Sequence, residues 1–206
     1  MTKSKVLAAL LICAAVCTRA AAQTAEVGGG VSGVFITSGG DFFGRGLHSA
    51  ALDARGSVAL TDRFALESFV TYGRRSISVS AYGSNVIGGD TQRTEGLYGV
   101  VVHQRLRSTT RSGFHAYLSY GLNGAYFNET IPEHQFVNGR TVYYTQPART
   151  RSDNQPMLFP SVGFGVRKSL GNHLAVRADA DLVAFLAIPA GVRASVSLAV
   201  PLGRAR

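Results

Sequence analysis

The sequence predicts an all-β fold in which eight antiparallel strands follow one another in up-and-down order and close into a transmembrane β-barrel. Three observations support this prediction. Segments of alternating apolar and polar residues recur along the chain. Glycine is abundant, with 24 residues, while charged residues make up only 16% of the chain. Short connections alternate with long polar ones, as expected for a meander of strands with two different faces.

The first 22 residues are predicted to be a secretory signal peptide. Lys3 and Lys5 form a positive start, Val6–Val16 is a short apolar run, and Ala20–Ala22 offers small residues for cleavage. The apolar run is shorter than the about 20 residues that a membrane-spanning helix needs. We therefore expect a cleaved signal peptide at residues 1–22 and an exported barrel domain at residues 23–206.

The positions of the cysteines and the distribution of charge exclude some classes of function. Cys13 and Cys17 both lie in the predicted signal peptide, so the mature chain has no disulfide and no thiol chemistry. The formal charge of +9 includes Lys3, Lys5 and Arg19, and their removal leaves +6 (9 − 3). The basic residues are scattered rather than gathered in a run, so we expect no nucleic-acid partner. Solvated or mutually paired arginines are the simpler explanation, and contact with anionic lipid headgroups is the alternative.

Eight segments are predicted to be strands, in chain order 27–37, 51–60, 64–72, 93–106, 114–127, 158–168, 174–183 and 192–200. Each carries apolar residues at alternate positions: Val31 and Phe35; Leu52, Ala54, Val58 and Leu60; Phe64, Leu66 and Val70; Tyr98, Val100 and Val102; Phe114, Ala116, Leu118, Tyr120 and Leu122; Val162, Phe164 and Val166; Leu174, Val176, Ala178, Ala180 and Leu182; Val192, Ala194, Val196, Leu198 and Val200. Most of the intervening residues are small, polar or charged. Each strand therefore has one apolar and one polar face.

The connections differ in length from one end of the strands to the other. Those at 61–63, 107–112 and 169–172 are tight, whereas those at 38–50, 80–92 and 128–157 are longer and polar. The longest contains Asn138-Gly139, which predicts a small hairpin within the loop. Short turns at one end and long loops at the other describe an up-and-down meander.

The length of the segments and the charges on their polar face favour a barrel in a membrane. A membrane strand needs about 9–11 residues, whereas strands of soluble sheets have about 5–6. The polar face carries charges of both signs: Asp53, Arg55, Glu67, Glu95, Arg105, Arg167, Arg177, Asp179, Asp181 and Arg193. Eight strands enclose an interior that side chains can fill, and charges there need partners, so we expect a structural network of ion pairs. A soluble β-sandwich is the structural alternative.

Two groups of residues suggest chemistry, and we weigh both against simpler roles. Asp179-x-Asp181 has the spacing of a metal-binding pair, but no third ligand lies nearby in sequence, and the same spacing places both carboxylates on one strand face. We expect no metal and no cofactor. His115 and Ser119 share a face of one strand, with His103 on its neighbour, but no orienting acid or oxyanion donor is evident. We expect no enzyme activity.

Aromatic residues near the predicted strand ends fit the interfacial girdles of membrane barrels, and packing within loops is the alternative. They are Phe42, Phe43, Tyr72, Tyr126, Phe127, Phe159 and Phe185.

The signal peptide, the eight alternating segments and the stretch VGFGVRKSLGNHLAVRADADLV at 162–183 resemble the small bacterial outer-membrane β-barrels of the OmpA-like and OmpX-like class. The resemblance covers roughly residues 25–203 and rests on the pattern rather than on an invariant motif. It implies a Gram-negative outer membrane, with the short turns periplasmic and the long loops extracellular.

The expected function is structural, or binding of an extracellular ligand through the long loops. Within residues 128–157, Phe136, Tyr143 and Tyr144 are the candidate binding residues, and an unordered surface loop is the alternative. We expect contacts with outer-membrane lipid and lipopolysaccharide, and a monomer. A narrow porin-like channel and, less favoured, a lipid-modifying enzyme are the other function classes.

Overall fold

The computed structural model describes residues 25–36, 47–82, 85–106, 113–171, 173–185 and 188–202. The predicted signal peptide lies outside these residues. Across the described ranges, no helix is long and apolar enough to cross a membrane.

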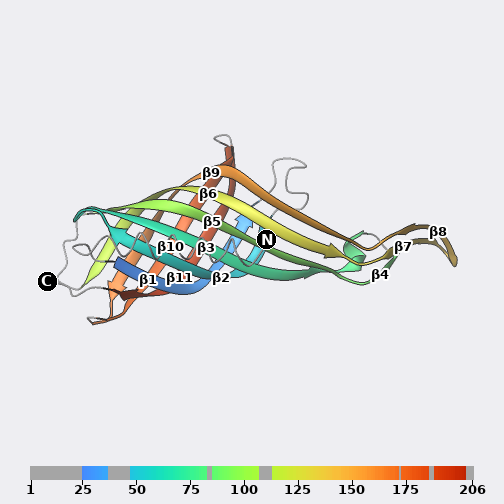
Figure 1. Ribbon diagram of the computed structural model, residues 1–206, viewed down its shortest axis with the longest axis horizontal. Helices are drawn as coiled ribbons and strands as arrows, with labels where there is room; N and C mark the ends of the chain where they lie inside the picture. The colour runs from blue at the N-terminus through green and yellow to red at the C-terminus, as the bar shows by residue number, and fades with distance from the viewer. Residues whose placement is uncertain are drawn as a thin grey trace.

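Eight long strands form a closed antiparallel barrel (Figure 1). Their bounds are β1 (Ala25–Ile36), β2 (Leu47–Ala59), β3 (Phe64–Ile77), β5 (Thr91–Arg105), β6 (Phe114–Ile131), β9 (Arg149–Ser169), β10 (Ala175–Phe185) and β11 (Ile188–Pro201). Each strand pairs with its neighbours in chain order, and β1 pairs with β11 to close the sheet. The predicted eight-stranded up-and-down barrel is therefore confirmed.

A three-stranded sheet extends the barrel at the end with the long connections (Figure 1). It contains β4 (Val86–Gly88), β7 (His134–Asn138) and β8 (Thr141–Gln146), and the short 3₁₀ helix η1 (Val79–Tyr82) lies nearby in the chain. The hairpin predicted at Asn138-Gly139 is confirmed: a two-residue turn joins β7 to β8, and Gly139 takes a φ of 62° that favours glycine.

The prediction of one long loop at 128–157 is wrong. Strands β6 and β9 stay paired from the barrel out to Ile131 and Arg149, so most of this segment is strand. With 21 residues, β9 is about twice as long as the 9–11 residues that cross a membrane. The extension is therefore built on a continuation of the barrel wall.

The two faces of the barrel wall differ in polarity. Large apolar side chains that are 41–66% exposed point outward from every strand of the barrel; among them are Val31, Phe35, Leu52, Tyr72, Val100, Tyr120, Leu122, Val162, Phe164, Leu182, Val192, Val196 and Leu198. Most of the charged residues at the intervening positions are buried in the interior: Asp53, Arg55, Glu67, Arg93, Glu95, Glu129, Arg177, Asp179, Asp181 and Arg193. This is the reverse of a soluble protein, in which apolar side chains fill the core.

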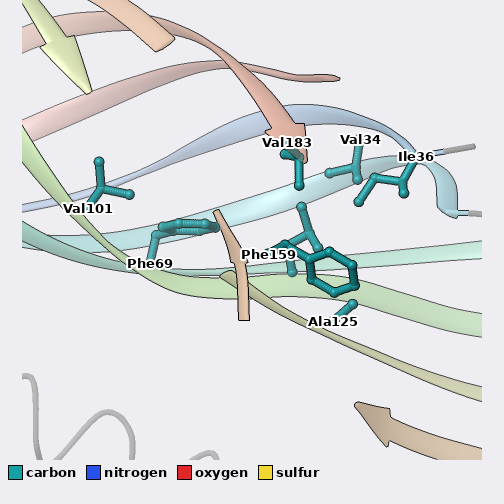
Figure 2. Packing of buried hydrophobic residues seen from close by; sticks show 8 residues of the cluster. Val34, Ile36, Phe69, Val101, Ala125, Phe159 and Val183 are labelled. Carbon is teal, nitrogen blue, oxygen red and sulfur yellow. The ribbon is translucent and has the colours of Figure 1, made fainter. Parts of the chain in front are cut away.

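The interior also contains an apolar layer, which the alternation pattern did not predict. Val34, Ile36, Phe69, Leu97, Val101, Ala125, Phe159 and Val183 form one cluster of buried residues inside the barrel (Figure 2). The aromatic girdle expected at the strand ends is wrong for Phe127 and Phe159, which are 4% and 0% exposed. Phe42, Phe43 and the side chain of Phe185 lie outside the described residues, whereas Tyr72 is 52% exposed on the outer face.

Candidate functional site

A network of buried charges crosses the barrel interior on the short-turn side of the apolar layer. Arg55 of β2 donates from Nε to Asp53 (2.7 Å) and from Nη1 to Asp179 of β10 (2.6 Å). Arg177 of β10 forms an ion pair with Glu67 of β3, which also lies 3.5 Å from Arg55 Nη1. Five of the predicted residues are thus brought together from three strands.

Tyr117 and His103 complete this central network. The Tyr117 hydroxyl donates to Asp179 and accepts from Arg177 Nη2 at 3.2 Å. The His103 ring meets the Tyr117 ring edge to face, with 4.7 Å between ring centroids, and places Nε2 3.5 Å from Glu67. Three carboxylates therefore face two guanidinium groups, and His103 adds a third positive charge when it is protonated.

Gly165 makes room for the contact between Tyr117 and Asp179. It faces the interior on β9, opposite Tyr117 on one neighbouring strand and Asp179 on the other. A Cβ at this position would lie 2.5 Å from the Tyr117 ring and 2.5 Å from Asp179 Oδ1, which real Cβ atoms essentially never do. Because glycine has no side chain, its position on the polar face leaves space for large side chains in a narrow lumen.

A second, smaller group of charges lies next to the apolar layer. Arg193 of β11 donates from Nη2 and Nε to Asp181 Oδ2 at 2.6 and 3.0 Å. The Ser119 hydroxyl donates to the other oxygen of Asp181 at 2.6 Å. The guanidinium of Arg193 stacks on Phe69, 3.8 Å from the ring centroid, and so connects the charged group to the apolar layer.

The remaining predicted residues lie nearer the barrel ends. Glu95 is fully buried on β5, 2.7 Å from Arg93 Nε and 3.4 Å from Arg75 Nε. Arg167 of β9 binds Glu26 of β1 at 2.5 Å. Arg105 is exposed at the short-turn end and forms no ion pair with another described residue. The ten predicted residues therefore divide into five in the central network, two in the second buried group and three nearer the barrel ends.

These contacts define what the interior can do chemically. Both carboxylates of Asp179-x-Asp181 are held by arginine and hydroxyl donors, and no group of three or more candidate ligands for a metal ion occurs in the described part of the chain. Ser119 directs its hydroxyl to Asp181, while His103 faces Glu67 and Arg177. The arrangement uses Ser119 and His103 as members of a packed polar network.

The candidate binding residues lie on the extension. Phe136 of β7 packs against Tyr144 of β8, with 5.5 Å between ring centroids, and lies 6.5 Å from the ring of Tyr143. Tyr143 and Tyr144 are 65% and 54% exposed. This small aromatic cluster is carried by the paired strands β7 and β8. Figure 1 shows these strands extending beyond the barrel.

The sequence analysis did not predict several partners of these charged residues: Glu26, Arg75, Arg93, His103, Tyr117 and Ser195. For some of them a usable signal was present. Tyr117 stands at the same alternate positions of its strand as His115 and Ser119, which marks it as inward-facing. It was missed because the predicted luminal network included charged residues only.

Comparisons with known proteins agree with this architecture. The sequence matches no protein-family model and no curated protein. Three solved structures resemble the chain in fold: Ail, the attachment invasion locus protein of Yersinia pestis, the N-terminal β-barrel domain of Pseudomonas aeruginosa OprF, and a major outer membrane protein from Thermus thermophilus.

The structural similarity covers most of each chain, whereas the sequence identity is low. Ail is 9% identical, with a TM-score of 0.51 and 87% of this chain and 99% of that chain covered. The OprF domain is 12% identical, with a TM-score of 0.51 and coverages of 87% and 97%. The Thermus protein is 11% identical, with a TM-score of 0.54 and coverages of 86% and 99%. The chain therefore has the fold of small outer-membrane β-barrel proteins, as its resemblance to that class predicts.

Proposed function

We propose that the protein is exported and spans the bacterial outer membrane as a monomeric barrel without enzyme activity, with a structural or surface-binding role. The observation that carries this proposal is the polarity of the wall. Large apolar side chains cover the outside of a closed barrel, while ion pairs fill its inside. Lipid can cover such an outer face, and closure leaves no unpaired sheet edge in the membrane.

The interior supports a structural rather than a conducting role. The central network lies between the short-turn end and the apolar layer of Phe69, Phe159 and their neighbours, so polar side chains and then apolar ones fill the lumen. An eight-stranded barrel is just wide enough to be filled in this way. This filling argues against a porin-like channel.

The extension supports a binding role on the cell surface. The cluster of Phe136, Tyr143 and Tyr144 is carried on paired strands and therefore has a defined shape. Exposed tyrosines offer large contact area together with a hydrogen-bonding hydroxyl, at a small entropic cost. The proposed extracellular ligand binds there, while outer-membrane lipid and lipopolysaccharide surround the wall.

Two measurements test this proposal. First, mature protein refolded in detergent should migrate faster unheated than boiled on a gel and give a β-sheet circular dichroism spectrum. Recovery of the expressed protein in the soluble fraction would contradict the proposal. Second, trypsin added to intact cells should cut at Arg140 in the hairpin turn. An Arg140→Gln variant is the control, and cleavage at Arg140 only after cell lysis would place the extension on the other side of the membrane.

A further inference from the structure

A cavity of about 90 Å³ opens at the short-turn end of the barrel, opposite the extension. Its walls come from the β2–β3 turn, the start of β6 and the ends of β5 and β9, and its floor includes Arg177 and Tyr117 of the central network. One water needs about 10–15 Å³ of such space, so the cavity has room for several waters or for a small polyatomic ion. The floor is closed by the network, so a ligand would bind in the cavity rather than pass through it.

The charges around the cavity are unequal. Four arginines line it, against the carboxylates of Glu26 and Asp62. Arg167 is held by Glu26, and Arg177 by Glu67. Arg63 and Arg105 remain, and neither forms an ion pair with a described residue. Asp62 offsets one of these two charges, so the side chains that line the cavity keep a net excess of one positive charge after their ion pairs are made (2 − 1).

Arg63 and Arg105 are held next to each other. The backbone N–H of Arg105 donates to the carbonyl of Arg63 at 2.7 Å, which joins the β2–β3 turn to the end of β5. Two guanidinium groups on adjacent chain segments at the rim of one cavity can bind the same anion from two sides. Their planar forks match the oxygens of phosphate and carboxylate.

Two histidines beside the cavity have unused hydrogen-bonding capacity. His103 is 7% exposed, and His115 is half-buried. The Nδ1 atom of each ring is shielded from solvent and has no hydrogen-bond partner among the described residues. A ring N–H at either position needs an acceptor that the surrounding side chains do not supply.

From these observations we propose that the mouth cavity binds a phosphate-type oxyanion. The excess charge attracts an anion, the volume suits a group of tetrahedral size, and Arg63 and Arg105 supply the donors. The same chemistry is present in free phosphate and in the headgroup of an anionic phospholipid. A headgroup could enter because the cavity opens at the rim of the barrel.

The test uses mature protein folded in a sugar-headgroup detergent, which contains no phosphate. Its unfolding temperature is measured with inorganic phosphate or with short-chain phosphatidylglycerol, each against chloride at the same ionic strength. We expect a rise with at least one of them. The ligand that gives the rise identifies the source, and binding should weaken at least about tenfold in an Arg63→Gln/Arg105→Gln variant.

Arg74→Gln, an exposed arginine on β3 at the other end of the barrel, is the matched control and should keep the full response. Since Arg63 and Arg105 are exposed, their replacement should leave the heat-dependent gel shift of the barrel unchanged. The inference is overturned if neither ligand raises the unfolding temperature beyond chloride, or if the double variant responds as the parent does. If neither ligand raises the unfolding temperature but the heat-dependent gel shift is intact, only the anion site is refuted, and the proposed function as an outer-membrane barrel is unaffected.

Discussion

Replacing Arg177 with methionine is the perturbation that addresses the charged interior most directly. Arg177 binds Glu67, whose side chain is 0% exposed, and lies 3.8 Å from Asp179. In the Arg177→Met variant, three buried carboxylates would share one guanidinium, that of Arg55. Methionine keeps most of the side-chain volume, so the change is mainly one of charge.

Breaking a buried pair by removing one partner costs about 3–5 kcal/mol, because it leaves a charge without compensation. The Arg177 side chain is 5% exposed, so water does little to screen the carboxylates left behind. We therefore expect the free energy of unfolding of Arg177→Met to fall by about 3–5 kcal/mol. Arg177→Ala, which also loses the packing of the side chain, should lower the unfolding temperature at least as much.

The measurement is urea unfolding of refolded protein in lipid vesicles, followed by circular dichroism. Arg74→Met, at an exposed position, is the control and should change stability by no more than about 0.5 kcal/mol. The double variant Arg177→Met/Glu67→Gln removes both charges and should be more stable than Arg177→Met alone. A loss below about 1 kcal/mol for Arg177→Met, or no recovery in the double variant, would refute the reasoning.

Three further predictions concern the outer face of the barrel wall, the close packing at Gly165 and the filled lumen. Val196→Arg places a charge on the outer face and should cost about 2–4 kcal/mol in vesicles, whereas a wall facing water would tolerate it. Gly165→Ala should cost about 1–3 kcal/mol in the same urea assay, because the added methyl group meets Tyr117; Gly33→Ala, with open space around it, is the control. In planar bilayers the protein should give no discrete conductance steps, since its lumen is filled, and regular steps would contradict this.

The period-two pattern was enough to predict the barrel strands and the sense of their faces. In the strand around Asp179, the alternate residues Arg177, Asp179 and Asp181 are buried, while Leu182 on the other face is exposed. The pleat of a strand forces this separation, so a local pattern contains the information. Segment length and opposite charges then indicated which face meets lipid.

The pairing of individual charges could not be predicted, because it depends on how the barrel closes. Glu67 and Arg177 are 110 positions apart in the chain, and they meet only because strand number and stagger bring β3 and β10 to face each other across the lumen. The apolar layer was missed for a related reason. Alternation shows that Phe69 and Phe159 lie on the inner face, but it does not tell what fills the lumen at that level.

The alternation of apolar and polar residues also could not predict the paired strands of the extension. Residues 149–152 of β9 are exposed and polar on both faces, so they carry no apolar alternation. What orders them is backbone pairing with β6, as between Glu129 and Arg151. Outside the membrane such a ribbon needs no apolar face, and its sequence therefore looks like a loop.

The central claim is that the apolar outer face of the barrel lies against lipid. Because both native cysteines, Cys13 and Cys17, lie in the predicted signal peptide, single cysteines can be introduced into the mature chain and labelled with a fluorophore. In vesicles that contain brominated lipid, a label on Val196→Cys should be strongly quenched, and one on Arg140→Cys in the hairpin turn should not. Equal and weak quenching at both positions would contradict the claim.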